Sequence, residues 1–203
     1  MLHFLYTHRT VSRTLSRDWF RLWAKRIINF PYLMKASFIQ RRLKLSGAKI
    51  GNLSLILCST VIKNSHKLTV GDHTYIDKGA SLSLHDRVTI GNNVAINSGA
   101  RIFTGSHDID SPFWPLVTKP VTIGDHVWIA SNSILLPGVS LGMGCVVAAG
   151  SVVTRSFPPN CIIAGNPGRA IKMRQDTQFE YSPTAFVSFF ECWIGSNFRL
   201  HPL

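Results

Sequence analysis

The chain has 203 residues and a formal net charge of +12, from 22 Lys and Arg against 10 Asp and Glu. No stretch reaches the ~18 apolar residues that a membrane-spanning helix requires, and residues 1–9 lack the charged-then-apolar order of a secretory signal. The four cysteines show no CxxC spacing, which disfavours a zinc site and suits a reducing compartment. We therefore expect one cytoplasmic domain with short appendages.

Residues 1–45 predict one or two basic helices. Residues 1–49 hold eleven Lys/Arg and one acid, Asp18 (11 − 1 = +10), and the remaining residues hold eleven and nine (11 − 9 = +2). Pro31 is expected to break the helix. Bases recur at every fourth residue, as a stripe on one helix would require: Arg9, Arg13, Arg17, Arg21 and Lys25. Bulky apolar residues would lie on another face: Trp19, Phe20, Trp23, Ile27 and Phe30.

Two interpretations of this segment stay open. An amphipathic helix through residues 9–30 could lie on an anionic membrane, which would place the protein at the inner membrane face. Alternatively, the helix could pack its aromatic face on the end of the following domain and leave its charges in water. The segment carries no recognisable nucleic-acid-binding motif, so we expect no nucleic-acid partner.

From residue 46 onward the sequence is a hexapeptide repeat. A branched apolar residue followed by glycine returns at Ile50, Val70 and Ile90, and again at Ile123. This spacing predicts a β-solenoid, because three short strands, each sending one side chain inward, complete one coil. Residues 46–103 predict three coils and residues 121–157 two more. The positions six apart are Ile50, Ile56, Ile62; Val70, Ile76, Leu82; Ile90, Ile96, Ile102; and Ile123, Ile129, Leu135, Leu141, Val147, Val153.

Glycines mark the expected corners of the coils. Gly51, Gly71, Gly91 and Gly124 are predicted to take positive φ. Each is followed by a residue that tolerates or hydrogen-bonds turns: Asn52, Asp72, Asn92 and Asp125. We interpret these residues as structural.

Two segments depart from the repeat. Thirty-three residues separate Ile90 from Ile123, so a loop at residues 104–120 is expected to leave the solenoid. Long excursions from a regular scaffold usually carry function. Residues 158–174 predict a closing turn and one last strand, and residues 175–203 an aromatic tail.

The run VTIGDHVWIASNSILLPGVSLGMGCVVAAGSVVTRSFPPNCIIAGNPGRAIKMR and the loop motif TGSHDID resemble the hexapeptide-repeat acyltransferases. The similarity covers about residues 50–174 and is strongest to sugar O-acetyltransferases of the colanic-acid, exopolysaccharide, maltose and galactoside type. It implies an all-β fold, a left-handed parallel β-helix with an N-terminal helical segment and a protruding loop. It also implies acetyl-CoA as co-substrate, no metal, and a homotrimer with sites between subunits.

The resemblance assigns the catalytic residue. Acetyl transfer from a thioester to a hydroxyl needs a base for the hydroxyl proton, and histidine suits this near neutral pH. His107 of TGSHD takes that role by resemblance. Asp108 and Asp110 are rival candidates to orient its ring. If the loop has not yet departed, Lys67, Arg87 and His107 stack in one column, and Arg87 would help to keep His107 neutral.

The acceptor site is expected on neighbouring coils. By resemblance Asp77 and His85 contact the acceptor. Stacking at twenty residues places Asn97 above Asp77. Trp128 is a candidate wall of the same pocket, and a backbone N–H of the 129–131 turn is the candidate oxyanion donor.

The resemblance also assigns the coenzyme site to the later coils. Ser131 and Ala149 line a groove for the pantetheine arm, and Thr154 and Arg155 bind further along. Arg169 and Lys172 meet the phosphates of the nucleotide end.

Other functions are weighed against this one. A related enzyme could acylate an amino sugar, serine or an antibiotic, and a membrane-associated solenoid could be a non-catalytic scaffold. A zinc hydratase on the same solenoid would need three histidines, two of them in an HxxxxH pair, and residues 46–174 contain no such pair. The sequence does not identify the acceptor.

Overall fold

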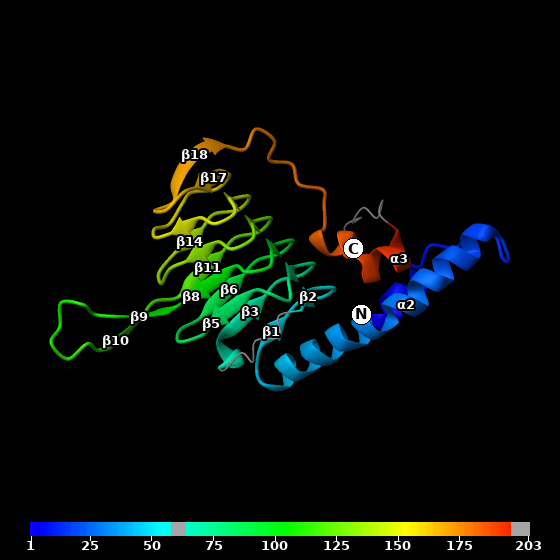
Figure 1. Ribbon diagram of the computed structural model, residues 1–203, viewed down its shortest axis with the longest axis horizontal. Helices are drawn as coiled ribbons and strands as arrows, with labels where there is room; N and C mark the ends of the chain where they lie inside the picture. The colour runs from blue at the N-terminus through cyan, green and yellow to red at the C-terminus, as the bar shows by residue number, and fades with distance from the viewer. Residues whose placement is uncertain (58–63, 196–203) are drawn as a thin grey trace.

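The computed structural model describes residues 1–57 and 64–195, which form a parallel β-solenoid flanked by helices (Figure 1). Three parallel sheets make the three sides of the prism. The first contains β1 (Lys49–Ile50), β3 (Leu68–Val70), β6 (Val88–Ile90), β11 (Val121–Ile123) and β14 (Ser140–Leu141). The second contains β2 (Leu55–Ile56), β4 (Tyr75–Ile76), β7 (Ala95–Ile96), β12 (Trp128–Ile129), β15 (Val146–Val147) and β17 (Cys161–Ala164). The third contains β5 (Ser81–Ser83), β8 (Arg101–Phe103), β13 (Ile134–Leu135) and β16 (Val152–Val153).

The strand register follows the predicted repeat. Ile50 pairs with Val70, Val70 with Ile90, Ile90 with Ile123, and Ile123 with Leu141. These side chains are buried in one continuous core along the solenoid axis. The expected solenoid with a helical segment and a protruding loop is therefore confirmed; the repeat position Ile62 lies outside the described residues.

The corner glycines have a different role from the one predicted. Positive φ falls two residues later, at Leu53, His73, Asn93 and His126, and not at Gly51, Gly71, Gly91 or Gly124. The reason for glycine is space, because a β-carbon on Gly51 would lie 2.2 Å from the Asp72 carboxylate of the next coil. That carboxylate accepts a hydrogen bond from the Asn52 N–H, and Asn92 and Asp125 repeat the contact one coil further on each time.

The excursion at residues 104–120 is a β-hairpin. β9 (Gly105–His107) and β10 (Leu116–Thr118) pair antiparallel, with His107 opposite Leu116. The hairpin projects away from the coils at the side opposite the helices (Figure 1). The solenoid ends in an antiparallel pair, β17 with β18 (Arg169–Met173), where the sequence predicted a single strand.

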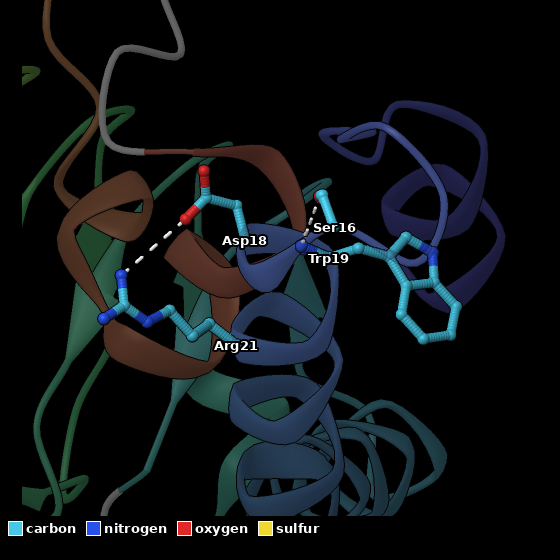
Figure 2. Close-up of polar contacts among 4 residues, drawn as sticks. All are labelled: Ser16, Asp18, Trp19 and Arg21. Atoms are coloured by element: carbon cyan, nitrogen blue, oxygen red, sulfur yellow. Dashed lines mark hydrogen bonds and ion pairs between the residues drawn. The ribbon is translucent and has the colours of Figure 1, made fainter.

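The N-terminal segment forms two helices, α1 (Leu2–Thr7) and α2 (Arg17–Leu45). Ser16 caps α2, since its hydroxyl accepts a hydrogen bond from the Trp19 N–H (Figure 2). The predicted basic stripe is therefore interrupted, because Arg9 and Arg13 precede the helix. Pro31 lies inside α2 and does not end it. Packing of Arg26 before the proline and of Leu33, Ala36 and Leu43 after it holds the two halves as one helix.

A second apolar cluster joins the helices to the first coils. Leu5, Leu33 and Leu55 pack with Phe189 and Phe190 of α3 (Ser188–Ile194), which follows the short 3₁₀ helix η2 (Pro183–Phe186). Arg26 is buried there and donates hydrogen bonds to the carbonyls of Cys192 and Thr10. In the described part of the chain, no helix is long and apolar enough to cross a bilayer.

The aromatic face predicted to cover the solenoid does not do so as a unit. Phe20 is 55% exposed, Ile27 69% and Phe30 47%. Trp19 and Trp23 are partly buried. The helix instead covers the fold with the face that carries Leu33, Ala36 and Leu43.

Candidate active site

Thr104 fixes the point where the hairpin leaves the coil. Its side chain is fully buried, and its hydroxyl donates to the Ser83 carbonyl at 2.6 Å while it accepts from the Asp86 N–H at 2.9 Å. The Lys119 N–H returns to the Thr104 carbonyl at 2.9 Å. Both arms of the hairpin are therefore tied to one residue, and the β11 strand resumes its pairing directly afterwards.

His107 lies at the end of β9 with an exposed imidazole. Its Nδ1 is 2.8 Å from the Trp114 carbonyl, and its ring stacks on the Trp114 indole with centroids 3.9 Å apart. Because a carbonyl can only accept, the neutral ring carries its proton on Nδ1, and the Nε2 lone pair stays available. The hairpin thus sets both the tautomer and the ring plane of His107.

His85 lies at the base of this hairpin. A β-carbon built on Gly105 would come within 2.8 Å of the His85 ring, so the two residues are in close contact. Only glycine allows this approach. His85 and His107 therefore belong to the same corner of the prism.

Asp77 and Asn97 form a separate column at the end of two strands of the second sheet, and Trp128 of the next coil is hydrogen-bonded to it. Register places Tyr75 beside Ala95 and Ala95 beside Trp128, and Asp77 and Asn97 follow two residues after the first two positions. The Trp128 Nε1–H donates to the Asn97 side-chain oxygen at 2.6 Å. Asp77 accepts from the Lys78 N–H at 2.6 Å. The predicted stacking of Asp77 and Asn97 is confirmed.

The phenol of Tyr75 lies next to Asp77 in this part of the second sheet. Burial and the hydrogen-bonded carboxylate of Asp77 raise the pKa of the Tyr75 phenol well above its ordinary value. Tyr75 therefore stays a neutral donor beside Asp77. The column presents a carboxylate, an amide and an indole edge, which are groups suited to hydroxyl recognition.

The later coils carry the predicted coenzyme residues. Ser131 and Ala149 lie in adjacent coils, since the Gly150 N–H donates to the Ser131 carbonyl at 3.0 Å. Ala149 and Gly150 are exposed, and a β-carbon added to Gly150 would meet no atom within 4 Å. This open, small-residue surface leaves room for a thin chain.

The cations follow at the end of the solenoid. Arg169 begins β18 and Lys172 lies within it opposite Ile162, while Thr154 and Arg155 follow β16 directly. All four side chains are exposed. Their position beyond the small-residue surface fits a ligand with an uncharged arm and an anionic end.

Comparison with known proteins identifies the fold family. The Bacterial transferase hexapeptide (six repeats) family matches residues 120–155. A protein of Escherichia coli K12 named "Putative colanic acid biosynthesis acetyltransferase WcaF" is 37% identical over 136 residues, which cover 67% of this chain and 75% of that protein. The chain belongs to the hexapeptide-repeat transferase family.

Two further members of the family are similar. Galactoside O-acetyltransferase of E. coli K12 is 33% identical over 115 residues, or 55% of this chain and 57% of that one. The hexapeptide-repeat acetyltransferase VCA0836 of Vibrio cholerae, solved with acetyl coenzyme A, superposes with a TM-score of 0.61 at 26% identity, covering 86% of this chain and 98% of that chain. The enzyme class and co-substrate expected from the sequence agree with these hexapeptide-repeat relatives.

Lys67 lies beside Arg87, since Leu68 pairs with Val88, but His107 does not continue this column, because the loop has already left the coil. Val88 pairs with Val121, and the Val121 N–H donates to the Arg87 carbonyl, so the residue above Arg87 lies after the hairpin. The chain leaves the coil at Thr104, three residues before His107. Arg87 is therefore not stacked on the imidazole.

The orienting partner of His107 was also missed. Asp108 accepts a hydrogen bond from the Asp110 N–H and its own N–H donates to the Pro115 carbonyl, so these residues shape the hairpin. The partner is the backbone carbonyl of Trp114, which has positive φ. A backbone carbonyl cannot be predicted from residue type. The signal in the sequence was the aromatic residue Trp114 itself, whose ring stacks on His107.

An HxxxxH pair does occur in the chain, at His3 and His8, outside the solenoid. His8 follows α1 and bonds within its own turn. Among the described residues, no group of three His, Cys, Asp or Glu could hold a metal ion.

Proposed function

We propose that this hexapeptide-repeat protein is an acetyl-CoA-dependent O-acetyltransferase that modifies a hydroxyl of a sugar or exopolysaccharide precursor, with His107 as general base. Family membership supports the acyl transfer. The single observation that supports the base is the bond from Nδ1 of His107 to the Trp114 carbonyl, which directs Nε2 outward. The sugar acceptor is inferred from the relatives, which include galactoside O-acetyltransferase.

Transfer is direct in this proposal. Nε2 of His107 takes the proton of the acceptor hydroxyl as its oxygen attacks the thioester carbonyl. The tetrahedral intermediate collapses with cleavage of the carbon–sulfur bond. The imidazolium returns the proton to the leaving thiolate, so coenzyme A and the acetyl ester are released and His107 is regenerated.

Backbone hydrogen bonds narrow the choice of the N–H group in the 129–131 turn that would bind the oxyanion. The Ala130 N–H already donates to the Val147 carbonyl at 2.9 Å. We assign the role to the Ser131 N–H, which lies beside the small-residue surface. The pantetheine arm would follow Ser131 and Ala149, Thr154 and Arg155 would contact it further along, and Arg169 and Lys172 would bind the phosphates.

The proposed site is completed by a second copy. In one chain, His107 and the column of Asp77, Asn97 and Trp128 lie at different corners, separated by the strand β8. A homotrimer would place the hairpin of one solenoid against the column of the next. At an acetyl-CoA concentration far below the raised KM of an Arg169→Ala/Lys172→Ala protein, mixing that protein with a His107→Ala protein should then restore activity in hybrid sites, whereas sites built within one chain would give no restoration.

Thiol release from acetyl-CoA tests the proposal. The purified protein is incubated with nucleotide sugars, free sugars and lipid-linked oligosaccharides, and with amino sugars and serine as alternative acceptors. His107→Ala should lower the acceptor-dependent rate by about 10²–10⁴-fold, whereas His73→Ala, at a solenoid corner, should not. Loss with neither variant would remove His107 from the chemistry.

The same panel separates the alternatives. Transfer to amino groups alone would favour an N-acyltransferase. No release with any acceptor, together with no binding of acetyl-CoA by calorimetry, would favour the scaffold interpretation.

A further inference from the structure

The outward face of α2 carries a continuous apolar stripe. At 100° per residue, the stripe residues fall within an arc of about 80° whose centre is opposite the buried Leu33, Ala36 and Leu43. Phe38 is 69% exposed and Leu45 80%. We call this face the α2 stripe; it contains Phe20, Ala24, Ile27, Pro31, Met34 and Phe38, and Leu45 extends it.

The α2 stripe faces away from the rest of the protein. The inner side of α2 contacts α3, β1 and β2, and Figure 1 shows the helix along the outer edge of the first coils with its far side free. No described side chain of the protein covers Phe38 or Ile27, which are both mostly exposed. The stripe is an exposed apolar patch of the kind that marks an interaction surface.

Cations border this stripe and acids do not. Arg17 and Lys35 lie on one side of the arc, Arg41 on the other, and Arg42 within it, all exposed. The acid of α2, Asp18, forms an exposed ion pair with Arg21 at 3.7 Å (Figure 2), and at 100° per residue it lies on the face opposite the stripe. The bordering cations therefore lie at the start of the helix and in its C-terminal part, and no acid lies among them.

This charge pattern decides between two partners. The alternating spacing of four and three residues also suits a helix seam, but pairing two α2 stripes would bring Lys35, Arg41 and Arg42 of both copies together without acids to neutralise them. Pro31 further interrupts the seam. Anionic lipid headgroups complement the cations, and the acyl boundary takes the aromatic and aliphatic side chains.

We propose that α2 is a membrane-surface helix, which binds anionic bilayers by lying in the interface with the α2 stripe inserted. This inference stands on the exposed helix face and its charges, independently of the acyl acceptor. It assigns to the N-terminal helix α2 a binding function separate from acetyl transfer.

Vesicle co-flotation of the full-length protein tests the proposal. The protein should float with vesicles that contain phosphatidylglycerol, bind pure phosphatidylcholine vesicles far less, and lose binding in high salt. Phe38→Ser should weaken binding by about tenfold or more, because the ring leaves the apolar boundary. The matched control is Phe186→Ser, at a phenylalanine 67% exposed outside the stripe, which should bind normally.

Charge reversal gives an independent readout. Lys35→Glu/Arg42→Glu should weaken binding by about a hundredfold or more, since each base near an anionic surface contributes about 1 kcal/mol. Arg87→Glu/Arg101→Glu makes the same change of net charge on the solenoid and should have little effect. Equal losses in both pairs would mean unspecific attraction and overturn the proposal. So would no flotation of the unmodified protein, or stripe variants that change only the oligomeric state measured by light scattering, which would assign the stripe to a second copy.

Discussion

Replacing Thr104 by valine tests how the hairpin that carries His107 is held. Valine keeps the shape of threonine but removes the hydroxyl that bonds Ser83 and Asp86 inside a fully buried site. The Ser83 carbonyl and the Asp86 N–H would both lose their partner. At about 1–3 kcal/mol for each buried group left without a bond, and with partial relaxation, we expect a loss of about 2–4 kcal/mol in the free energy of unfolding.

The assay is urea unfolding followed by circular dichroism, together with the melting temperature. For a chain of this size the loss corresponds to a decrease of roughly 5–15 °C in Tm. Thr104→Ser keeps both bonds and should stay close to the unmodified protein. Thr122→Val, at an exposed position of β11, is the matched control and should change stability by less than about 0.5 kcal/mol. If Thr104→Val is as stable as Thr122→Val, the anchoring role of the hydroxyl is refuted.

Three further predictions address the site and the corners. Trp128→Phe removes the indole N–H bonded to Asn97, so the KM for the acceptor should rise about 2–10-fold while the KM for acetyl-CoA stays constant; equal rises in both would place the tryptophan elsewhere. Arg169→Ala/Lys172→Ala should raise the KM for acetyl-CoA about tenfold or more. The rate with acetyl-pantetheine, which lacks the nucleotide phosphates, should stay unchanged. A lower rate with both donors would contradict phosphate binding by these residues. Burial holds the pKa of His73 and His126 below the ordinary 6.5. The unfolded chain therefore binds more protons than the folded protein as the pH falls, and the free energy of unfolding should decrease from about pH 7.5 to 5.5. His73→Gln/His126→Gln should flatten this dependence in urea titrations, and an unaltered slope would exclude these rings as its source.

The repeat was predictable because each coil imposes the same local requirement. An inward branched residue at every sixth position can be counted, and its register was correct at each described position from Ile50 to Val153. The glycine corners were located correctly but explained wrongly. Whether Gly51 is needed for its φ or because a β-carbon would collide with Asp72 depends on the neighbouring coil, which local sequence does not reveal.

The errors in the helix and the loop have a similar origin. Pro31 is a helix breaker by intrinsic preference, yet tertiary packing on both sides keeps α2 continuous. The residue type of His107 led to its proposed role as base, but the hydrogen-bond partner of its ring is a main-chain oxygen whose position depends on hairpin closure. The column with Arg87 failed because counting by twenty assumed that the chain was still inside the coil.

The pairing of Val88 with Val121 continues the sheet as though residues 104–120 were absent. The hydrogen bonds of Thr104 and the contact of Gly105 with His85 connect the base of the excursion to the prism, whereas its tip projects away from the coils (Figure 1). Hairpins of other lengths could therefore be exchanged at this position while the scaffold, and the small-residue surface along it, stayed intact. This architecture therefore allows a surface loop of about seventeen residues to change in length and sequence while the packing of the solenoid core stays the same.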